Sequence, residues 1–294
     1  MQTYKQGYKA GEKGAWFGII SNLLLFVVKI FAGIFGRSQA MVADAFHTGS
    51  DALTSIGVLI GFKIARKPAD DHHPLGHGKT ESFVASIIAM VLIALGVGIV
   101  VHTGRILITG NFKTPESIAL VVALVSIVVK EFTFKRVLKT SNEIGSASLK
   151  ADAYHHRSDV ISSVAAFIGI LGARLGYAIM DPLASIVVAA FILKMGADTF
   201  HLAYDELLDA APPDEFYDHI REIVESVDCV AQIKDVCVRK AGIEQFLEVT
   251  IGVRGEMTVD DSHMVTVKIQ DALFEKVPSV KDVVIHVEPV GDKD

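Results

Sequence analysis

ADAFHTGSD, at residues 43–51, recurs as ADAYHHRSD at residues 151–159, so the pattern A-D-A-aromatic-H-x-x-S-D occurs twice, 108 positions apart. Both copies lie in apolar sequence that is long enough to span a membrane. An ionisable residue at the centre of a membrane helix costs roughly 2.5 to 3.5 kcal/mol on insertion scales, and it usually faces a partner or a water-filled path. The repeat therefore predicts a shared polar site inside a membrane domain.

Composition and hydropathy predict a membrane protein with six transmembrane helices. Apolar residues make up 51% of the 294 positions and the mean hydropathy is +0.43, which is more hydrophobic than an ordinary soluble domain. About 20 mostly apolar residues are needed to cross the ~30 Å hydrocarbon core. Six segments are long enough: 14–35, 38–65, 82–106, 115–137, 145–175 and 177–202. The second and the fifth segment, which carry the repeat, are the most polar.

Basic residues are distributed unevenly among the expected loops. The N-terminal arm has three lysines but no signal-peptide pattern, so we expect it to be retained. If the arm is cytoplasmic, its side of the membrane also collects Lys63, Arg66, Lys67, Lys79, Lys135, Arg136, Lys139 and Lys150. The opposite loops hold only Arg37, Arg105, Lys113 and Arg174. By the positive-inside rule, both ends of the six-helix domain are expected in the cytoplasm.

The composition changes at Asp209, where a second, water-soluble domain is expected to begin. Residues 209–294 contain 19 acidic and nine basic residues, a net charge of about −10. Hydrophobic periodicity predicts a helix, two strands, a helix and a strand, at residues 216–227, 233–239, 245–253, 260–276 and 282–288. This order predicts a small α+β sandwich. Its two cysteines, Cys229 and Cys237, form neither a disulfide framework nor a CxxC zinc motif.

Each copy of the repeat offers two metal ligands. The histidine and the aspartate stand four residues apart, so both face the same side of a helix. A single pair of this kind is more often a structural hydrogen-bonded contact, but its duplication in two apolar segments favours a shared metal site. Four His and Asp ligands in a tetrahedron suit Zn²⁺, whereas Ca²⁺ and Mg²⁺ prefer more oxygen. The candidate ligands are His47, Asp51, His155 and Asp159.

Three further residues of the repeat have less certain roles. Asp44 and Asp152, each three positions before a histidine, either orient the imidazoles or line a wet cavity, and the sequence leaves both readings open. His156 points about 100° away from His155 on a helical wheel, so we expect it to take no part in the site.

The spacing of the two copies predicts an inverted repeat. Because two expected helices lie between them, the second and fifth helices should run in opposite directions across the membrane. Inverted repeats with a site near the bilayer midplane are a recurrent architecture of secondary transporters. The arrangement therefore favours a moving transport site over a static structural one.

The connection between the second and third helices has further candidate ligands. Its sequence PADDHHPLGHGK, at residues 68–79, contains three histidines and two aspartates within eight positions. This predicts a metal site in the loop, and the alternative is a solvated polar turn. Gly78-Lys79-Thr80 is similar to the end of a phosphate-binding loop, but the glycine required five positions earlier is His73. No nucleotide cofactor is therefore expected.

Taken together, these motifs resemble the cation diffusion facilitator family of divalent metal exporters, of the bacterial zinc/iron exporter type. The resemblance rests on the paired H-x-x-x-D motifs, on residues 68–81 and on VIHVEP at residues 284–289, and it covers essentially the whole chain. It implies an α-helical membrane domain of six helices, residues 1–208, with both termini cytoplasmic. It also implies an α+β, metallochaperone-like cytoplasmic domain, residues 209–294, in a homodimer of the bacterial inner membrane.

The resemblance also assigns residues to sites. It places His47, Asp51, His155 and Asp159 in the transport site; Asp70, His73 and His77 in a loop site; and His263, His286 and Glu288 in a regulatory site of the C-terminal domain. Lys234 and Thr250 fill two other ligand positions of that last site, and neither is a good zinc ligand, which argues against a complete binuclear centre. Lys79 and Asp209 are implied to form a charge interlock where the two domains meet.

These observations predict proton-coupled efflux of a divalent metal, Zn²⁺ first and Cd²⁺ as a further cargo, by alternating access. An imidazole must be neutral to bind metal and titrates near pH 6.5 when unperturbed, so protons and metal compete for the same site. Protons, the lipid bilayer and a second copy of the chain are the expected partners, and nucleic acid is not.

Three alternatives stay open at this point. Fe²⁺ or Mn²⁺ could be the cargo instead of Zn²⁺, and ligand type does not exclude Co²⁺ or Ni²⁺. An intramembrane metalloenzyme would need an open metal position, and the sequence lacks HExxH. A membrane-anchored metal sensor would use the acidic tail as its main binding site. We expect the tail instead to adjust transport by favouring one state of the membrane domain.

Overall fold

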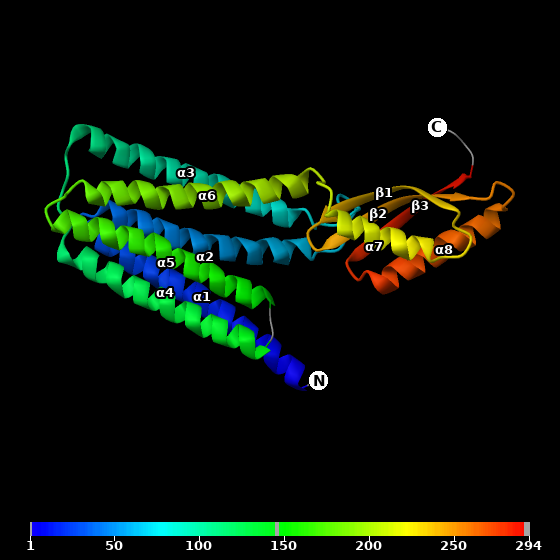
Figure 1. Ribbon diagram of the computed structural model, residues 1–294, viewed down its shortest axis with the longest axis horizontal. Helices are drawn as coiled ribbons and strands as arrows, with labels where there is room; N and C mark the ends of the chain where they lie inside the picture. The colour runs from blue at the N-terminus through cyan, green and yellow to red at the C-terminus, as the bar shows by residue number, and fades with distance from the viewer. Residues whose placement is uncertain (1, 145–146, 291–294) are drawn as a thin grey trace. The chain divides into compact units, whose positions relative to one another are not determined.

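The first part of the chain consists of six long helices, at the six predicted segments (Figure 1). The computed structural model describes residues 2–144 and 147–290, with side chains for 17–142, 150 and 153–290. The helices are α1 (Gln2–Phe35), α2 (Gln39–Ala65), α3 (Thr80–Thr109), α4 (Ser117–Ile144), α5 (Ala147–Arg174) and α6 (Met180–Leu207).

Within the described part of the chain, four segments are long and apolar enough to cross a membrane: Phe17–Phe35 in α1, Thr80–Thr109, Ser117–Asn142 in α4 and Met180–Leu207. Helices α2 and α5 are not among them, because they carry the polar repeat. The membrane character of the domain is thus confirmed, while the expected count of six spans stays a prediction.

The packing of these helices is that of a membrane domain. Small side chains fill their interior, including Ala32, Ala40, Ala43, Ala119, Ala123, Ala166 and Ala184. Large apolar side chains point outward instead, including Leu24, Phe31, Phe83, Val121, Phe132 and Ile161. Lipid tails are as apolar as leucine, so membrane helices associate through close packing of small residues. At Gly169 a Cβ atom would lie 2.2 Å from that of Ala184, so α5 and α6 approach each other closely.

The N-terminus of α2, which carries the first copy of the repeat, is fixed by a carboxylate from α6. Asp181 accepts hydrogen bonds from Ser38 Oγ at 2.6 Å and from the backbone N–H of Gln39 at 2.6 Å. The first N–H groups of a helix have no partner within the helix, and a carboxylate there also complements the helix dipole. Asp181 therefore sets the position of α2 relative to α6.

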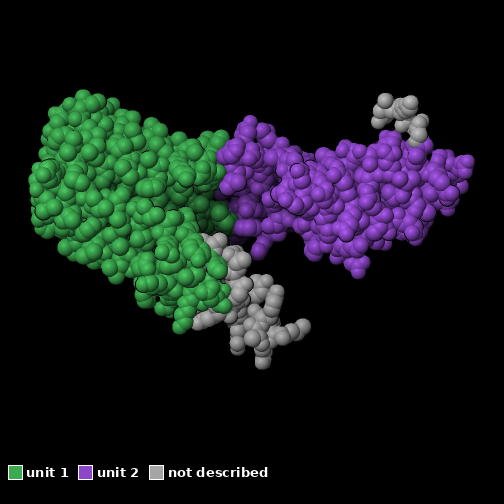
Figure 2. Space-filling model, viewed as in Figure 1, with its two compact units in different colours: residues 1–59, 85–200 green, residues 60–84, 201–294 purple. Residues whose placement is uncertain are grey.

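The chain divides into two compact units, coloured separately in Figure 2. One contains residues 1–59 and 85–200, and the other contains residues 60–84 and 201–294. The polar loop between α2 and α3 thus belongs to the same unit as the acidic tail. The expected domain boundary after residue 208 stays a prediction.

The tail folds as the predicted α+β sandwich. It contains α7 (Asp214–Glu225), β1 (Gln232–Ala241), β2 (Glu244–Val253), α8 (Val259–Lys276) and β3 (Val280–Pro289). The sheet order is β1-β2-β3, with β1 antiparallel and β3 parallel to β2. A parallel pair needs a crossover connection, and α8 supplies it. Thr258 caps α8, its side chain accepting the backbone N–H of Asp261 at 3.2 Å.

Helices α7 and α8 cover one face of the sheet, and the other face carries polar side chains. The shared core is formed by Ile220, Ile223, Val224, Val236, Val238, Leu247, Val249, Ile251, Val265, Ile269 and Leu273. Strand residues that alternate with this core are exposed, among them Cys237, Glu248 and His286. The period of two along the strands therefore places His286 on the face opposite the helices.

The loop between α2 and α3 packs against the turn that joins β1 to β2. A Cβ atom at Gly78 would lie 2.5 Å from the carbonyl oxygen of Ala241, so only glycine fits there. Gly242, which has φ of +63°, donates its backbone N–H to Glu206 Oε1 at 2.7 Å. Glycine adopts this left-handed conformation without steric cost. These contacts hold the end of the loop and of α6 to the tail's sheet within one unit.

Candidate metal centre

The two copies of the repeat meet inside the helical unit. Ligand atoms of His47, Asp51 and Asp159 all lie within 4.8 Å of one another, and His47 Nε2 is 3.7 Å from Asp159 Oδ1. Asp44 contacts Ser163 at 3.0 Å, so positions early in α2 meet positions late in α5. This order of contacts shows that α2 and α5 run in opposite directions, as the spacing predicted.

The three side chains are buried, and their polar atoms are largely unpaired within the protein. Their exposed fractions are 5%, 5% and 2% for His47, Asp51 and Asp159. Among the residues whose side chains are described, four of their atoms accept or donate no hydrogen bond: His47 Nδ1, Asp51 Oδ1 and Oδ2, and Asp159 Oδ2. Buried polar groups are almost always paired, and a buried carboxylate without a partner is costly. The cluster therefore has free capacity to bind a cation.

The fourth predicted ligand, His155, lies outside this group. Its side chain is exposed, while the next residue, His156, is buried with Nδ1 3.9 Å from Asp159 Oδ2. Gly18 of α1 makes room for the His156 ring, because a Cβ atom there would lie 2.9 Å from Nε2. The residue expected to take no part is thus the histidine of α5 nearest to the buried carboxylate. His155 as a ligand stays a prediction, and the side chain of Asp152 lies outside the described residues.

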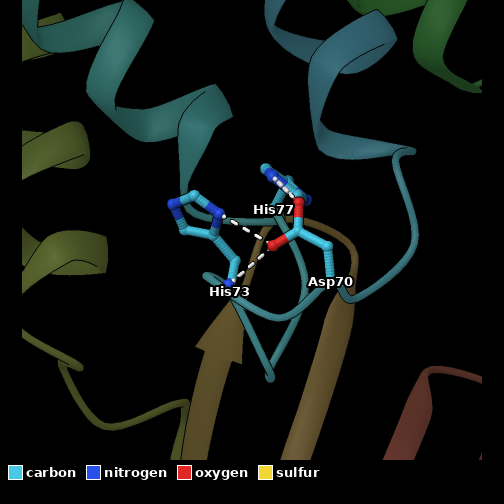
Figure 3. A group of neighbouring side chains, drawn as sticks. All are labelled: Asp70, His73 and His77. Atoms are coloured by element: carbon cyan, nitrogen blue, oxygen red, sulfur yellow. Dashed lines mark hydrogen bonds and ion pairs between the residues drawn. The ribbon is translucent and has the colours of Figure 1, made fainter.

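The loop residues Asp70, His73 and His77 also form a group whose ligand atoms lie within 4.8 Å of one another (Figure 3). His73 Nδ1 is 3.2 Å from Asp70 Oδ1, and His77 Nε2 is 3.4 Å from Asp70 Oδ2. Two imidazoles therefore flank one carboxylate, at the spacing that the sequence predicts for a metal site. The other candidates of the loop, Asp71 and His72, do not join this group.

The backbone of the loop stabilises the charge of Asp70. The N–H groups of His73 and His72 donate to Oδ1 at 2.7 and 3.0 Å. The hydrogen bond from the His73 N–H is the main cause that holds the pKa of Asp70 below its usual value. A carboxylate that is kept ionised, beside two imidazoles, is a suitable ligand for a divalent metal.

The candidate ligands of the tail do not come together in the same way. His286 Nε2 is 3.3 Å from Glu288 Oε1, but His263 lies exposed on α8 and joins no group of three among the described residues. Lys234 forms an ion pair with Glu288, and this hydrogen bond is the main cause of the lowered pKa of Glu288. An ammonium group therefore already neutralises the carboxylate of the predicted regulatory site.

The structure brings the predicted charge pair together. Lys79 Nζ lies 2.7 Å from Asp209 Oδ1 and also donates to the carbonyl of Leu207 at 3.2 Å. Arg239 adds a second cation 3.2 Å from Asp209 Oδ2. Asp209 thus joins the start of α3, the end of α6 and strand β1 within the second unit.

Comparisons with known proteins identify the family. The model of the cation efflux transmembrane domain matches residues 15–208, and that of the cation efflux protein cytoplasmic domain matches residues 212–290. The chain belongs to the cation diffusion facilitator family. It is therefore an integral membrane protein of a family of cation transporters.

Individual relatives cover nearly the whole of this facilitator. It is 31% identical to the manganese efflux system protein MneP of Bacillus subtilis, over 95% of this chain and 96% of that protein. It is 34% identical to metal tolerance protein C1 of Arabidopsis thaliana, over 98% of this chain and 64% of that protein. A solved cytosolic domain of a cation diffusion facilitator family protein is 37% identical, covering 26% of this chain and 93% of that domain, with a TM-score of 0.26.

The facilitator's membrane unit also contains two buried lysines that the motifs do not include. Lys29 of α1 has no exposed surface and ion-pairs with Asp44 at 2.7 Å. Lys130 of α4 is buried and donates to the backbone carbonyl of Asp159 at 3.3 Å. Each interrupts an apolar run, in FVVKIF and in IVVKEF. That interruption is the signal that could have identified them, since a charge inside a membrane helix usually has a functional partner.

Proposed function

We propose that this facilitator exports a divalent transition metal, Zn²⁺ first and Cd²⁺ as a second cargo, in exchange for protons. The observation that carries the proposal is the cluster of His47, Asp51 and Asp159, which is buried among helices and has unpaired nitrogen and oxygen atoms. Unpaired buried carboxylates are costly, so such a cluster is stabilised when a cation or protons bind to it. Its place in the two copies of the repeat, on helices of opposite direction, suits a site that two membrane halves can expose in turn.

Proton coupling follows from the chemistry of these ligands. A histidine must be neutral and a carboxylate ionised to bind a metal, so metal binding releases protons. Metal and protons are then alternative occupants of one buried site. Loading from the cytoplasm and release on the other side would move protons in the opposite direction. Alternating access without coupling would need a different way to neutralise the empty site.

The coupling can be measured in proteoliposomes that contain a pH-sensitive dye and receive Zn²⁺ on one side. We expect zinc-driven proton movement with the native chain and none with His47→Ala or Asp159→Ala. His201→Ala is the matched control, because His201 is an exposed histidine of α6 that contacts only Asp205 among the ion pairs of the described residues. Unchanged proton movement in His47→Ala and Asp159→Ala would exclude this cluster as the transport site.

Manganese is the alternative to zinc as the main cargo, and the types of ligand in the cluster favour it. The three gathered ligands are one imidazole and two carboxylates, and Mn²⁺ suits carboxylate ligands better than Zn²⁺ does. MneP, one of the relatives, is named as a manganese efflux protein. If His155 completes the site, the shell contains two nitrogens and two oxygens, which suits Zn²⁺.

His155 therefore separates the two metals. With Zn²⁺ as cargo, His155→Ala should raise the KM for Zn²⁺ about tenfold or more, in the range for loss of a group that supports a metal site. Uptake of Zn²⁺ and Mn²⁺ by the same vesicles measures this directly. If His155→Ala leaves the KM for Zn²⁺ unchanged, and the variant and the native chain both transport Mn²⁺ in preference to Zn²⁺, that result would favour Mn²⁺ as the cargo.

The same proposal extends to the rest of the chain. We place the domain boundary at residues 208/209, two copies in the assembly, and the protein in the cytoplasmic membrane of a bacterium. The tail would adjust transport by binding metal at His263, His286 and Glu288, with ligands shared between copies. Deleting residues 209–294 should then blunt the activation of transport by zinc. Unchanged metal dependence of the truncated chain would argue against this regulatory role.

A further inference from the structure

The Lys29–Asp44 pair lies beside the proposed transport site, and three oxygen atoms surround its ammonium group. Lys29 Nζ contacts Asp44 Oδ2 at 2.7 Å, Thr48 Oγ1 at 2.9 Å and Ser163 Oγ at 3.2 Å. An ammonium group has three donors, so each of them has an oxygen partner. Ser163 in turn donates to Asp44 Oδ1 at 3.0 Å, which closes a ring of three side chains.

This ring touches the backbone and side chains of the proposed site. Asp44 precedes His47 by three positions, about one turn of α2. Ser162 lies 3.4 Å from Asp44 Oδ1 and donates to the carbonyl of Asp159 at 2.8 Å. The ring thus joins α1, α2 and α5 one turn from the unpaired ligands. Its oxygen atoms surround the ammonium group as they would surround a small cation.

The two carboxylates of α2 therefore differ in availability. Among the described residues, neither oxygen of Asp51 has a hydrogen-bond or ammonium partner. Asp44 Oδ2 has no hydrogen bond either, but it lies 2.7 Å from the Lys29 ammonium group, and Asp44 Oδ1 accepts a hydrogen bond from Ser163. The sequence alone left open whether Asp44 orients an imidazole or lines a cavity. In the structure its main partner is Lys29 instead.

We propose that Lys29 is a specificity-determining residue, a resident cation that keeps Asp44 out of the coordination shell of the transported metal. The proposal rests on the proposed function of the buried cluster. With Asp44 held by Lys29, the shell keeps His47, Asp51 and Asp159 as its gathered ligands and holds one divalent ion. Without Lys29, an uncompensated carboxylate would lie in the membrane interior, which is costly. It would recruit the neighbouring metal and favour ions that prefer oxygen, such as Mn²⁺.

The test uses the full-length protein, with Asp70, His73, His77, His263 and His286 replaced by alanine so that the buried cluster dominates binding. Competition against a coloured chelator gives the Kd for Zn²⁺ and for Mn²⁺. We expect Lys29→Met to shift the ratio of the two Kd values toward Mn²⁺ by about tenfold, within the range seen when a residue that supports a metal ligand is changed. Lys29→Arg should keep the native ratio, because it keeps the charge.

The second variant separates specificity from folding. Lys29→Met with Asp44→Asn removes both charges, so the ratio should return to the native value. If Lys29 only holds the helices together, Lys29→Met lowers the unfolding temperature and weakens both metals equally, and that result overturns the proposal. Lys194→Met, at an exposed lysine of α6, controls for a general loss of positive charge.

The binding readout also distinguishes two kinds of failure. If Asp51→Asn in the same background leaves metal binding intact, the buried cluster is not the metal site, and the proposed function fails first. If Asp51→Asn abolishes binding but Lys29→Met leaves the Zn²⁺ to Mn²⁺ ratio unchanged, the site stands and the role of Lys29 is wrong.

Discussion

The cluster between α2 and α5 and the cluster in the loop before α3 each bring three His and Asp side chains within 4.8 Å of one another. In the loop cluster, the carboxylate of Asp70 accepts hydrogen bonds from two backbone N–H groups and lies beside two imidazoles. The buried cluster instead has four polar atoms without a hydrogen bond to any described residue. The exposed site can therefore persist without metal, whereas the buried site depends on its cargo or on protons.

The strongest test of this difference is to neutralise a buried carboxylate. Asp51→Asn keeps the shape of the side chain but removes a ligand charge, and we expect metal flux into proteoliposomes to fall to the background of empty vesicles. Asp198→Asn, at an exposed carboxylate of α6, is the control and should transport normally. Flux above one tenth of the native rate in Asp51→Asn would remove this residue from the site.

The loop cluster should respond less severely. Asp70→Asn keeps an acceptor for the backbone N–H groups but loses the charge between the two imidazoles. We expect the affinity of the loop for Zn²⁺ to fall about 10- to 100-fold, with transport reduced but not abolished. Measuring binding and flux on the same preparation checks both parts. Complete loss of flux would show that the loop belongs to the main transport path.

The loop should also depend on pH in one direction. Because the fold lowers the pKa of Asp70, its contribution to loop structure is complete above the ordinary carboxyl pKa of about 3.9. It is lost as the pH falls through the lowered value. Protection of the His72 and His73 amides from hydrogen exchange, relative to their intrinsic rates, should therefore persist at pH 5 and be lost only in stronger acid. Fast exchange at pH 5 would contradict the hydrogen bonding of Asp70.

A third way to test the comparison is to convert the tail's ion pair into a metal site. Lys234→His replaces the ammonium beside Glu288 and His286 with a nitrogen ligand. We expect the affinity of the tail for Zn²⁺ to rise about tenfold, an effect of the size seen when groups around a metal site change. Arg254→His, in the exposed loop after β2, is the control. Equal affinities of the two variants would mean that Lys234 does not occupy a ligand position.

The smallest effect is expected at the charge interlock. Lys79 and Asp209 are partly exposed, and an exposed pair is worth about 0 to 1 kcal/mol. Lys79→Ala should therefore lower the free energy of unfolding of the full chain by no more than about 1 kcal/mol. Thermal unfolding measures this. A much larger loss would show that the pair acts together with Arg239 and the carbonyl of Leu207 as a network.

The sequence predicted the local structure well because each signal is local. The 3.6-residue and two-residue periods placed the helices and strands of the tail to within a few residues, and hydropathy located the six long helices. The repeat also predicted that His47, Asp51 and Asp159 meet, because matching motifs on opposed helices face one another.

The residues that the sequence missed depend on helix rotation and on contacts far apart in the chain. A helical wheel fixes the angle between His155 and His156 but not which of them faces α2, and packing against Gly18 places His156 inside. Likewise, the partner of Asp44 lies 15 positions away on α1 and is joined by Ser163 from α5. The number of spans is undecided for a different reason: α2 and α5 are long helices at predicted segments, but the polar repeat that they carry keeps them from being recognised as membrane spans by hydropathy alone.

Anomalous scattering from crystals grown with Zn²⁺, and separately with Mn²⁺, tests the central claim most directly. The account predicts a zinc peak between α2 and α5, at ligand distances of about 2.0 to 2.2 Å from His47, Asp51 and Asp159. A second peak should lie between Asp70, His73 and His77. Peaks confined to the loop and the tail, with none between α2 and α5 at saturating metal, would contradict a transport site in the buried cluster.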